Sequence, residues 1–248
     1  MLFLHIPKTG GTSLEDVIAA EYASPAGPAP GEPGSRTAFF EDGFCLGEQD
    51  LPGRMRAEAM ALGGEVSVVT GHFLYGFHRS IPRACTYLTL LRDPVDRVLS
   101  LYGHFLRWGD DSHGVRHGQL SLEQFVCESG CPELDNGQTR RLAGTGMPVP
   151  AGVQLLDAAR EHLAGGSVLS GLTERHEQSV ERFAAALGWR APAARPALVN
   201  QHRPVRERVP ASVIGEIMRR NELDAELLDH ARELFHGQAV TRSWHRLR

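Results

Sequence analysis

Two patterns of apolar residues alternate along the chain. Short, mostly apolar runs are typical of strands buried on both faces of a sheet, and they occupy 2–6, 66–70, 86–91 and 167–171. Apolar residues that recur every three or four positions predict amphipathic helices, which we place at 12–22, 93–108, 121–128, 136–142, 154–163, 180–187, 213–218 and 227–235. Strands that alternate with helices predict an α/β protein with a parallel sheet, and the later segments predict a helix-rich C-terminal half.

Local signals mark helix starts and one irregular segment. Thr12 and Glu15 have the spacing of a capping box at the first predicted helix. Asp93 followed by Pro94 is typical of an N-cap and a first helical residue. Four prolines and three glycines interrupt 24–36, so we predict a surface loop or a disordered insert there.

Composition limits the classes of function. The 248 residues suit a single domain that spans 1–248. A net charge of −4 disfavours nucleic acid as a partner, so an anion site must be local. No apolar run approaches the roughly 20 residues that span a bilayer, so we expect no membrane partner. The short apolar N-terminus is predicted to be a strand rather than a signal peptide.

The cysteines give little information about function. There are four, which is too few for a disulfide scaffold: Cys45, Cys85, Cys127 and Cys131. Cys127 and Cys131 are four positions apart, so they could pair or bind a metal. The alternative is that they are two ordinary thiols in a reducing cytoplasm.

The most informative segment, 5–14, reads His-Ile-Pro-Lys-Thr-Gly-Gly-Thr-Ser-Leu and joins a predicted strand to a predicted helix. Such a junction directs backbone N–H groups and the positive end of the helix at one point, which suits a phosphate. The residues that could contribute are Lys8, Thr9, Gly10, Gly11, Thr12 and Ser13. In a Walker A loop the lysine follows the glycines, whereas here it precedes them, so we predict a different phosphate turn. The alternative is a glycine turn that only joins the strand to the helix.

A second candidate anion site follows the predicted strand 86–91. Arg92 stands at the end of that strand, and Ser100 lies eight residues later in the following helix. Arginine is a permanent cation with a bidentate fork, and the carboxyl ends of strands are where open α/β sheets bind ligands. The alternative is structural: Asp93 caps the helix and Arg92 pairs with an acid.

Together, in this order, the two motifs resemble those of sulfotransferases that use 3′-phosphoadenosine 5′-phosphosulfate (PAPS). The amino-acid sequence of 5–13 is most similar to the branch of heparan sulfate and uronyl 2-O-sulfotransferases and their bacterial relatives. The segments 105–111 and 171–175 also resemble this branch. The resemblance implies a sheet like that of P-loop NTPases, flanked by helices, and a cytoplasmic bacterial protein. It implies that 8–13 bind the 5′-phosphosulfate, that Arg92 and Ser100 bind the 3′-phosphate, and that no metal is needed.

The same resemblance implies further site residues. A histidine that ends a strand is the catalytic base in that branch, and the matching residue is His72. Histidine also suits this role chemically, because its pKa lies near working pH. A late basic loop often closes over the 3′-phosphate, which makes Arg203 and Arg206 candidate contacts. His5, inside the first predicted strand, is expected to be packed, and His78, His104, His113 and His117 form no convincing metal set.

The acceptor site is the least determined part. His104 shares a helix face with Ser100 and is a fallback base or an acceptor contact. Arg140 and Arg141 belong to a polar cluster that either binds the acceptor or is a solvated helix end. The oligomeric state cannot be predicted from the sequence.

The predicted reaction is in-line transfer of the sulfuryl group to a hydroxyl of a saccharide-like or small natural-product acceptor. His72 takes the hydroxyl proton, and Lys8 with the turn amides stabilises the leaving phosphate, giving 3′-phosphoadenosine 5′-phosphate (PAP). Two alternatives stay open: a P-loop-type small-molecule kinase and a non-catalytic nucleotide-binding module.

Overall fold

The computed structural model describes residues 1–23, 27–32, 34–40, 46, 50–62, 66–108, 119–190 and 202–237. A five-stranded sheet in the order β2-β3-β1-β4-β5 forms the centre. All neighbouring strands are parallel. The strands are β1 (Leu2–Leu4), β2 (Thr37–Phe40), β3 (Val68–Gly71), β4 (Tyr87–Leu91) and β5 (Val168–Leu172). The predicted α/β class with a P-loop-NTPase-like parallel sheet is therefore confirmed.

Nine α-helices are assigned among the described residues, and every predicted helix is found within a few residues of its expected limits. They are α1 (Gly11–Tyr22), α2 (Leu51–Ala61), α3 (Pro94–Trp108), α4 (Leu122–Glu128), α5 (Gly137–Ala143), α6 (Val153–Ala164), α7 (His176–Leu187), α8 (Ala211–Arg220) and α9 (Glu222–Gly237). Short 3₁₀ turns occur at Phe77–Ser80, Pro132–Leu134, Thr173–Arg175 and Arg206–Arg208.

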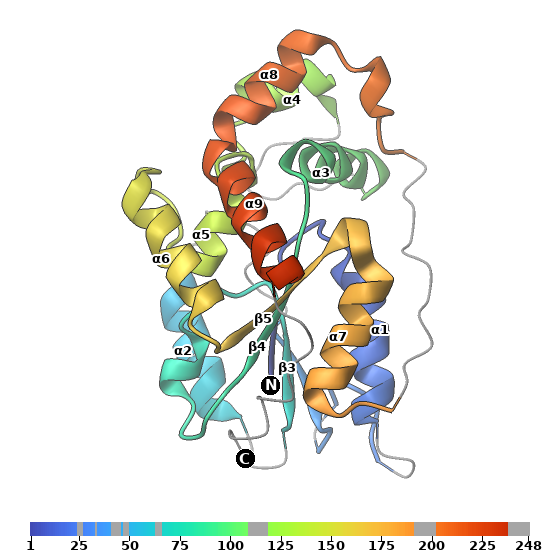
Figure 1. The fold of residues 1–248 in the computed structure, drawn as a ribbon, viewed down its shortest axis with the longest axis vertical. Helices are drawn as coiled ribbons and strands as arrows, with labels where there is room; N and C mark the ends of the chain where they lie inside the picture. The colour runs from blue at the N-terminus through green and yellow to red at the C-terminus, as the bar shows by residue number, and fades with distance from the viewer. Residues whose placement is uncertain are drawn as a thin grey trace.

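The helices bury the sheet from both sides (Figure 1). Apolar side chains of α1 and α7 pack on one face, around Phe3. Those of α2, α6 and α9 pack on the other face, around Leu4. A separate core joins α3, α4 and α8, which lie together above the sheet in Figure 1. Covered faces explain why β1, β3 and β4 consist of buried residues throughout.

Two elements were not predicted. β2 is four residues long and follows the Pro/Gly-rich segment, so it lacks a long apolar run. α2 carries only a thin apolar stripe, with Pro52 and Gly53 in its first turn and an exposed Met60. Tertiary contacts rather than local pattern therefore hold these elements. The described residues of 24–36 contain turns and bends but no helix or strand.

The capping box predicted at the first helix is wrong. Gly10, with a left-handed φ of 86°, is the N-cap of α1, and no side chain caps it. Thr12 is exposed, and the Glu15 carboxylate instead accepts hydrogen bonds from His5 and Thr70. The cap predicted for α3 is confirmed, because the Asp93 carboxylate accepts from the Asp96 N–H at 2.9 Å.

Several remaining expectations concern cysteines, histidines and membrane contact. Cys127 is exposed and Cys131 is buried, and neither these two nor Cys85 takes part in a disulfide. Cys45, His113 and His117, together with 109–111 of the segment similar to sulfotransferases, lie outside the described residues. Within the described part of the chain, no helix is both long and apolar enough to cross a bilayer.

Candidate active site

The turn between β1 and α1 is held in one shape by its own contacts. The Thr9 hydroxyl donates to the Ile6 carbonyl at 2.9 Å, and Thr9 is buried. Lys8 and Gly10 both have left-handed backbone angles, φ 68° and 86°. A side chain at Gly11 would lie 2.1 Å from the ring of His5, so only glycine fits there. The turn thus places the amides that begin α1 at the carboxyl edge of the sheet, where an anion can bind.

Lys8 is the only lysine in a chain with 26 basic residues. Its side chain is partly buried, and its Nζ lies 3.5 Å from His104 Nδ1. Burial lowers the pKa of Lys8 from its ordinary value, and the charges of Arg92 and Arg107 lower it further. A bound anion would relieve this repulsion.

Arg92, the first residue after β4, joins the second motif to the phosphate turn. Its Nη1 donates to the Lys8 carbonyl at 2.9 Å. Burial lowers the pKa of Arg92 to about 10, and the charge of Arg203 contributes in the same direction. The guanidinium therefore stays protonated at neutral pH. Ser100, two turns into α3, is buried, and its predicted phosphate contact stays a prediction.

The segment before α8 lies over the start of α3. Arg203 pairs with the Asp96 carboxylate at 2.5 Å, and Arg206 pairs with Asp93 at 2.9 Å. A side chain at Gly103 would come 2.9 Å from the Arg203 Cα, so this glycine permits the close approach. The structure thus brings both candidate late arginines to the second motif, although the paired residues are 107 and 113 positions apart in the sequence.

His72 follows β3, next to the segment that leads into the phosphate turn. Its Nδ1 lies 2.6 Å from the His5 carbonyl oxygen. Because a carbonyl only accepts, Nδ1 carries the proton and Nε2 has the lone pair. Burial holds the pKa of His72 well below its ordinary value, and the charges of His5, Arg141 and Lys8 lower it further, against a smaller opposing effect of this hydrogen bond. The imidazole is therefore neutral at pH 7, as a general base must be.

His5 and Glu15 support this arrangement and were not predicted as site residues. Glu15 Oε1 accepts from His5 Nδ1 at 3.0 Å and from the Thr70 hydroxyl at 2.6 Å. The rings of His5 and His72 are 4.5 Å apart between centroids. His5 is buried, as expected for a packed residue. The only sequence signal was the strand-to-helix junction itself, which brings the residue that follows β1 beside the first turns of the helix.

Arg140 and Arg141 are internal, so both alternatives predicted for them, an acceptor contact and a solvated helix end, are wrong. Both side chains are 0% exposed. Arg140 donates to the Asp135 carbonyl and carboxylate and to the Val149 carbonyl, and it forms an internal ion pair with Asp135. Arg141 binds the His72 carbonyl and the Glu133 carboxylate. His104, in contrast, is only partly buried on α3 beside Lys8, and its acceptor role stays a prediction.

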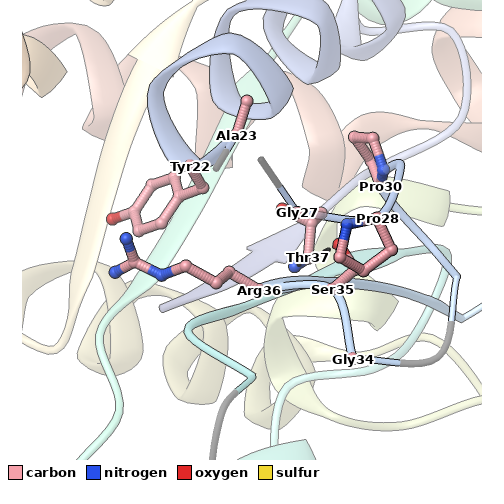
Figure 2. Close-up of a pocket in the computed structure, with 9 residues that line it drawn as sticks. All are labelled: Tyr22, Ala23, Gly27, Pro28, Pro30, Gly34, Ser35, Arg36 and Thr37. Atoms are coloured by element: carbon pink, nitrogen blue, oxygen red, sulfur yellow. Dashed lines mark hydrogen bonds between the residues drawn. The ribbon is translucent and has the colours of Figure 1, made fainter. Parts of the chain in front are cut away.

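Two cavities lie away from the turn at 8–13, Arg92 and His72. One, of about 400 Å³, lies between the C-terminal end of α1 and the segment before β2, and its lining includes Tyr22 and Arg36 (Figure 2). The Arg36 guanidinium lies 5.9 Å from the centre of the Tyr22 ring. The other, of about 530 Å³, is lined by residues that include Asn136 and Arg220. Neither contains a residue of the phosphate turn. The described residues hold no cluster of three or more potential metal ligands.

Fold and site together define a class: an α/β protein whose parallel sheet has a glycine turn, the predicted phosphate site, after its first strand and an arginine after a neighbouring strand. No family model matches the chain. The chain is 27% identical over 281 residues to heparan-sulfate 6-O-sulfotransferase 1 of Homo sapiens, covering 95% of this chain and 65% of the human enzyme. The same enzymes of Cricetulus griseus and Mus musculus are also 27% identical over 95% of this chain, which spans 67% and 65% of their lengths. This similarity supports a sulfotransferase family. Because the relatives are 6-O enzymes, it does not support the predicted 2-O branch.

Proposed function

We propose that this protein is a PAPS-dependent O-sulfotransferase that acts on a hydroxyl of a saccharide-like acceptor. The observation that carries the proposal is that three groups meet at one sheet edge. Lys8 lies in the phosphate turn, Arg92 is hydrogen-bonded to that turn, and a neutral His72 is fixed by the residues that lead into it. Distant similarity to heparan-sulfate sulfotransferases supports the same reaction class.

The residues at this edge fit the cofactor. The phosphosulfate end would lie on the turn amides with Lys8, whose pKa is lowered first by burial and then by the charges of Arg92 and Arg107. The 3′-phosphate would lie by Arg92, with Ser100, Arg203 and Arg206 as further contacts. Each of the two late arginines would then bind phosphate oxygens, either in place of its aspartate partner or in addition to it. PAPS, when bound, supplies a sulfuryl group activated by a phosphate leaving group.

The protein's own part in the reaction is proton transfer and charge stabilisation. His72 accepts the proton of the acceptor hydroxyl at Nε2, because Nδ1 is held on the His5 carbonyl. Lys8 and the amides of 9–13 stabilise the negative charge that develops on the leaving phosphate oxygen. Arg92 would bind the far end of the nucleotide and so limit its movement relative to Lys8 and His72.

The acceptor is proposed from the names of the relatives, which act on heparan sulfate. A saccharide hydroxyl is therefore preferred over a small natural product. The segment 5–13 resembles the 2-O branch, whereas the matched enzymes are 6-O enzymes. Determining which hydroxyl carries the sulfate in the product distinguishes the two positions.

The deciding experiment is calorimetric titration with PAP and, separately, with ATP–Mg²⁺. Wild type is compared with Arg92→Ala and with Arg160→Ala, which removes a surface arginine paired with Glu226. We expect selective PAP binding that Arg92→Ala weakens at least tenfold and that Arg160→Ala leaves unchanged. Preference for ATP–Mg²⁺ would favour a kinase and overturn the proposal. PAP binding without transfer from radiolabelled PAPS to any hydroxyl acceptor would instead indicate a nucleotide-binding module.

A further inference from the structure

One short helix, α5, contacts the ends of two strands that carry candidate active-site residues. Gln138 Oε1 accepts from the Arg92 N–H, and Gln138 Nε2 donates to the Arg92 carbonyl, each at 2.9 Å. The side-chain amide thus pairs with Arg92 as a neighbouring strand would, extending the β4 ladder by one residue. A single orientation of the Gln138 amide makes both bonds, so the N–H and the carbonyl of Arg92 are held together.

One turn later in α5, Arg141 holds the backbone of His72. Its Nη1 donates to the His72 carbonyl at 2.8 Å, and its Nη2 donates to Glu133 Oε1 at 2.7 Å. Glu133 is also fully buried and pairs with Arg97 at 3.2 Å. The buried Glu133 carboxylate therefore fixes the Arg141 guanidinium, which in turn binds the backbone of His72, the proposed base.

The start of α5 is itself fixed by Asp224 of α9. One oxygen of this buried carboxylate accepts from the Thr139 N–H and hydroxyl, both at 2.8 Å, and the other accepts from the Gln138 N–H at 3.2 Å. α5 also packs against α6 and α9 (Figure 1). Gln138 and Arg141 therefore project from a rigid support.

We propose that Gln138 and Arg141 are positioning residues, which set the placement of Arg92 relative to His72 and so the geometry of transfer. This inference rests on the proposed sulfotransferase function. The proposed cofactor arginine and the proposed base follow different strands, β4 and β3, and β1 lies between these strands. Side chains of α5 bind the backbone of Arg92 and the backbone of His72, so the positions of these two residues are fixed relative to the same helix.

Packing alone is a poor explanation for a buried arginine at position 141. Apolar residues of similar volume usually stabilise a core at least as well as a buried ion pair does. In addition, burial first of all, and then the charges of His5, Arg141 and Lys8, lower the pKa of His72 and so hold the imidazole in its neutral form. His5 is in turn paired with Glu15. Arg141 thus has two separate effects on His72, one on its position and one on its protonation.

Arg140 provides the matched control for Arg141. It belongs to the same helix and is equally enclosed, but its side-chain hydrogen bonds go to Asp135 and Val149 rather than to a strand end. We compare Arg141→Met with Arg140→Met, measuring the His72 titration by NMR, the pH profile of kcat/KM, and kcat and KM separately. Arg141→Met should raise the pKa of His72, shift the acid limb of the profile to higher pH and lower kcat by about 10² with little change in acceptor KM. Arg140→Met should lose stability but leave these quantities unchanged.

Conservative variants keep the test valid if a methionine variant fails to fold. Arg141→Lys retains the charge without the fork, so His72 should keep its pKa while kcat falls relative to Arg140→Lys. For the cofactor side, Gln138→Met should weaken PAP binding about tenfold, whereas Thr139→Val, which loses a bond to Asp224 but none to Arg92, should not.

Equal kcat and equal His72 titration in the Arg141 and Arg140 variants, or equal PAP affinity in the Gln138 and Thr139 variants, would overturn the inference. Failure of the proposed function has a different signature, which is wild-type protein that binds no PAP. The His72 titration needs no cofactor, so it tests the role of Arg141 in either case.

Discussion

His72 donates through Nδ1 to the main-chain carbonyl of His5 at 2.6 Å. This bond joins the end of β3 to the residue three positions before Lys8. The segment that begins the phosphate turn therefore also fixes the tautomer of the proposed base. The proposed base and the predicted phosphate turn are therefore linked through the main chain. A change of side chain at position 5 would not remove the carbonyl that accepts this hydrogen bond.

Replacing His72 by asparagine should separate chemistry from cofactor binding. We expect transfer to fall by about 10²–10⁴, because a positioned general base contributes this much, while PAP affinity changes little. Single-turnover transfer rates and calorimetry with PAP measure the two effects. His162→Asn is the matched control, since His162 Nδ1 also bonds a main-chain carbonyl, that of Leu142, at 2.7 Å. Equal loss of transfer in both variants would show that His72 is only structural.

The single lysine allows the phosphate turn to be observed directly. In protein labelled with ¹³Cε-lysine, one signal reports Lys8. Its pKa should lie below the ordinary 10.5, because burial and then the charges of Arg92 and Arg107 disfavour the ammonium form. Arg107→Ala should raise this pKa modestly, and PAP should raise it further by supplying negative charge. An ordinary pKa in the ligand-free protein, unmoved by PAP, would contradict the proposed location of the phosphates.

The sequence was sufficient to place Lys8, Arg92 and His72 together, because each follows a buried run and parallel strands end at one edge. It was not sufficient for Arg141, whose partner His72 is 69 positions away. A run of polar residues reads as a solvated helix end, and only the packing of α5 against Asp224 of α9 makes it internal. The strand β2 was missed for the same reason, since its support is its neighbour β3 rather than its own pattern.

Removal of a late arginine should affect cofactor binding more than folding. Arg203→Ala breaks a partly exposed ion pair with Asp96, and such pairs contribute about 0–1 kcal/mol to stability. A charged hydrogen bond to phosphate is worth about 1.5–3 kcal/mol, so PAP affinity should fall by roughly 10- to 100-fold. Arg206→Ala should act in the same direction. The control is Arg219→Ala, which removes an exposed pair with Glu216 within α8. If both late variants bind PAP as wild type does, the 3′-phosphate is held elsewhere.

Glu15 gives a prediction for the pH dependence of stability. Burial raises the pKa of Glu15, but hydrogen bonds from His5 and Thr70 and the charge of His5 outweigh it, and the pKa lies below its ordinary value of 4.5. A carboxylate with a lowered folded-state pKa adds stability that is fully present above the unfolded-state pKa and is lost as pH falls through the folded-state value. Glu15→Gln keeps an acceptor oxygen but not the charge, so it should cost about 1–3 kcal/mol at pH 7. The difference between variant and wild type should shrink as pH falls below about 4.5.

Urea unfolding from pH 7 down to about pH 4 measures this difference. Asp16→Asn, which neutralises the exposed neighbour on α1, should show no such trend. Glu15→Gln should also lose part of its transfer rate at pH 7, because Glu15 orients His5. The ring of His5 lies against Gly11, and its carbonyl accepts a hydrogen bond from His72. A stability deficit that is the same at both ends of the pH range would show that the charge of Glu15 has no role in the fold. A deficit at pH 7 with unchanged transfer would restrict Glu15 to stability and separate it from the placement of the base.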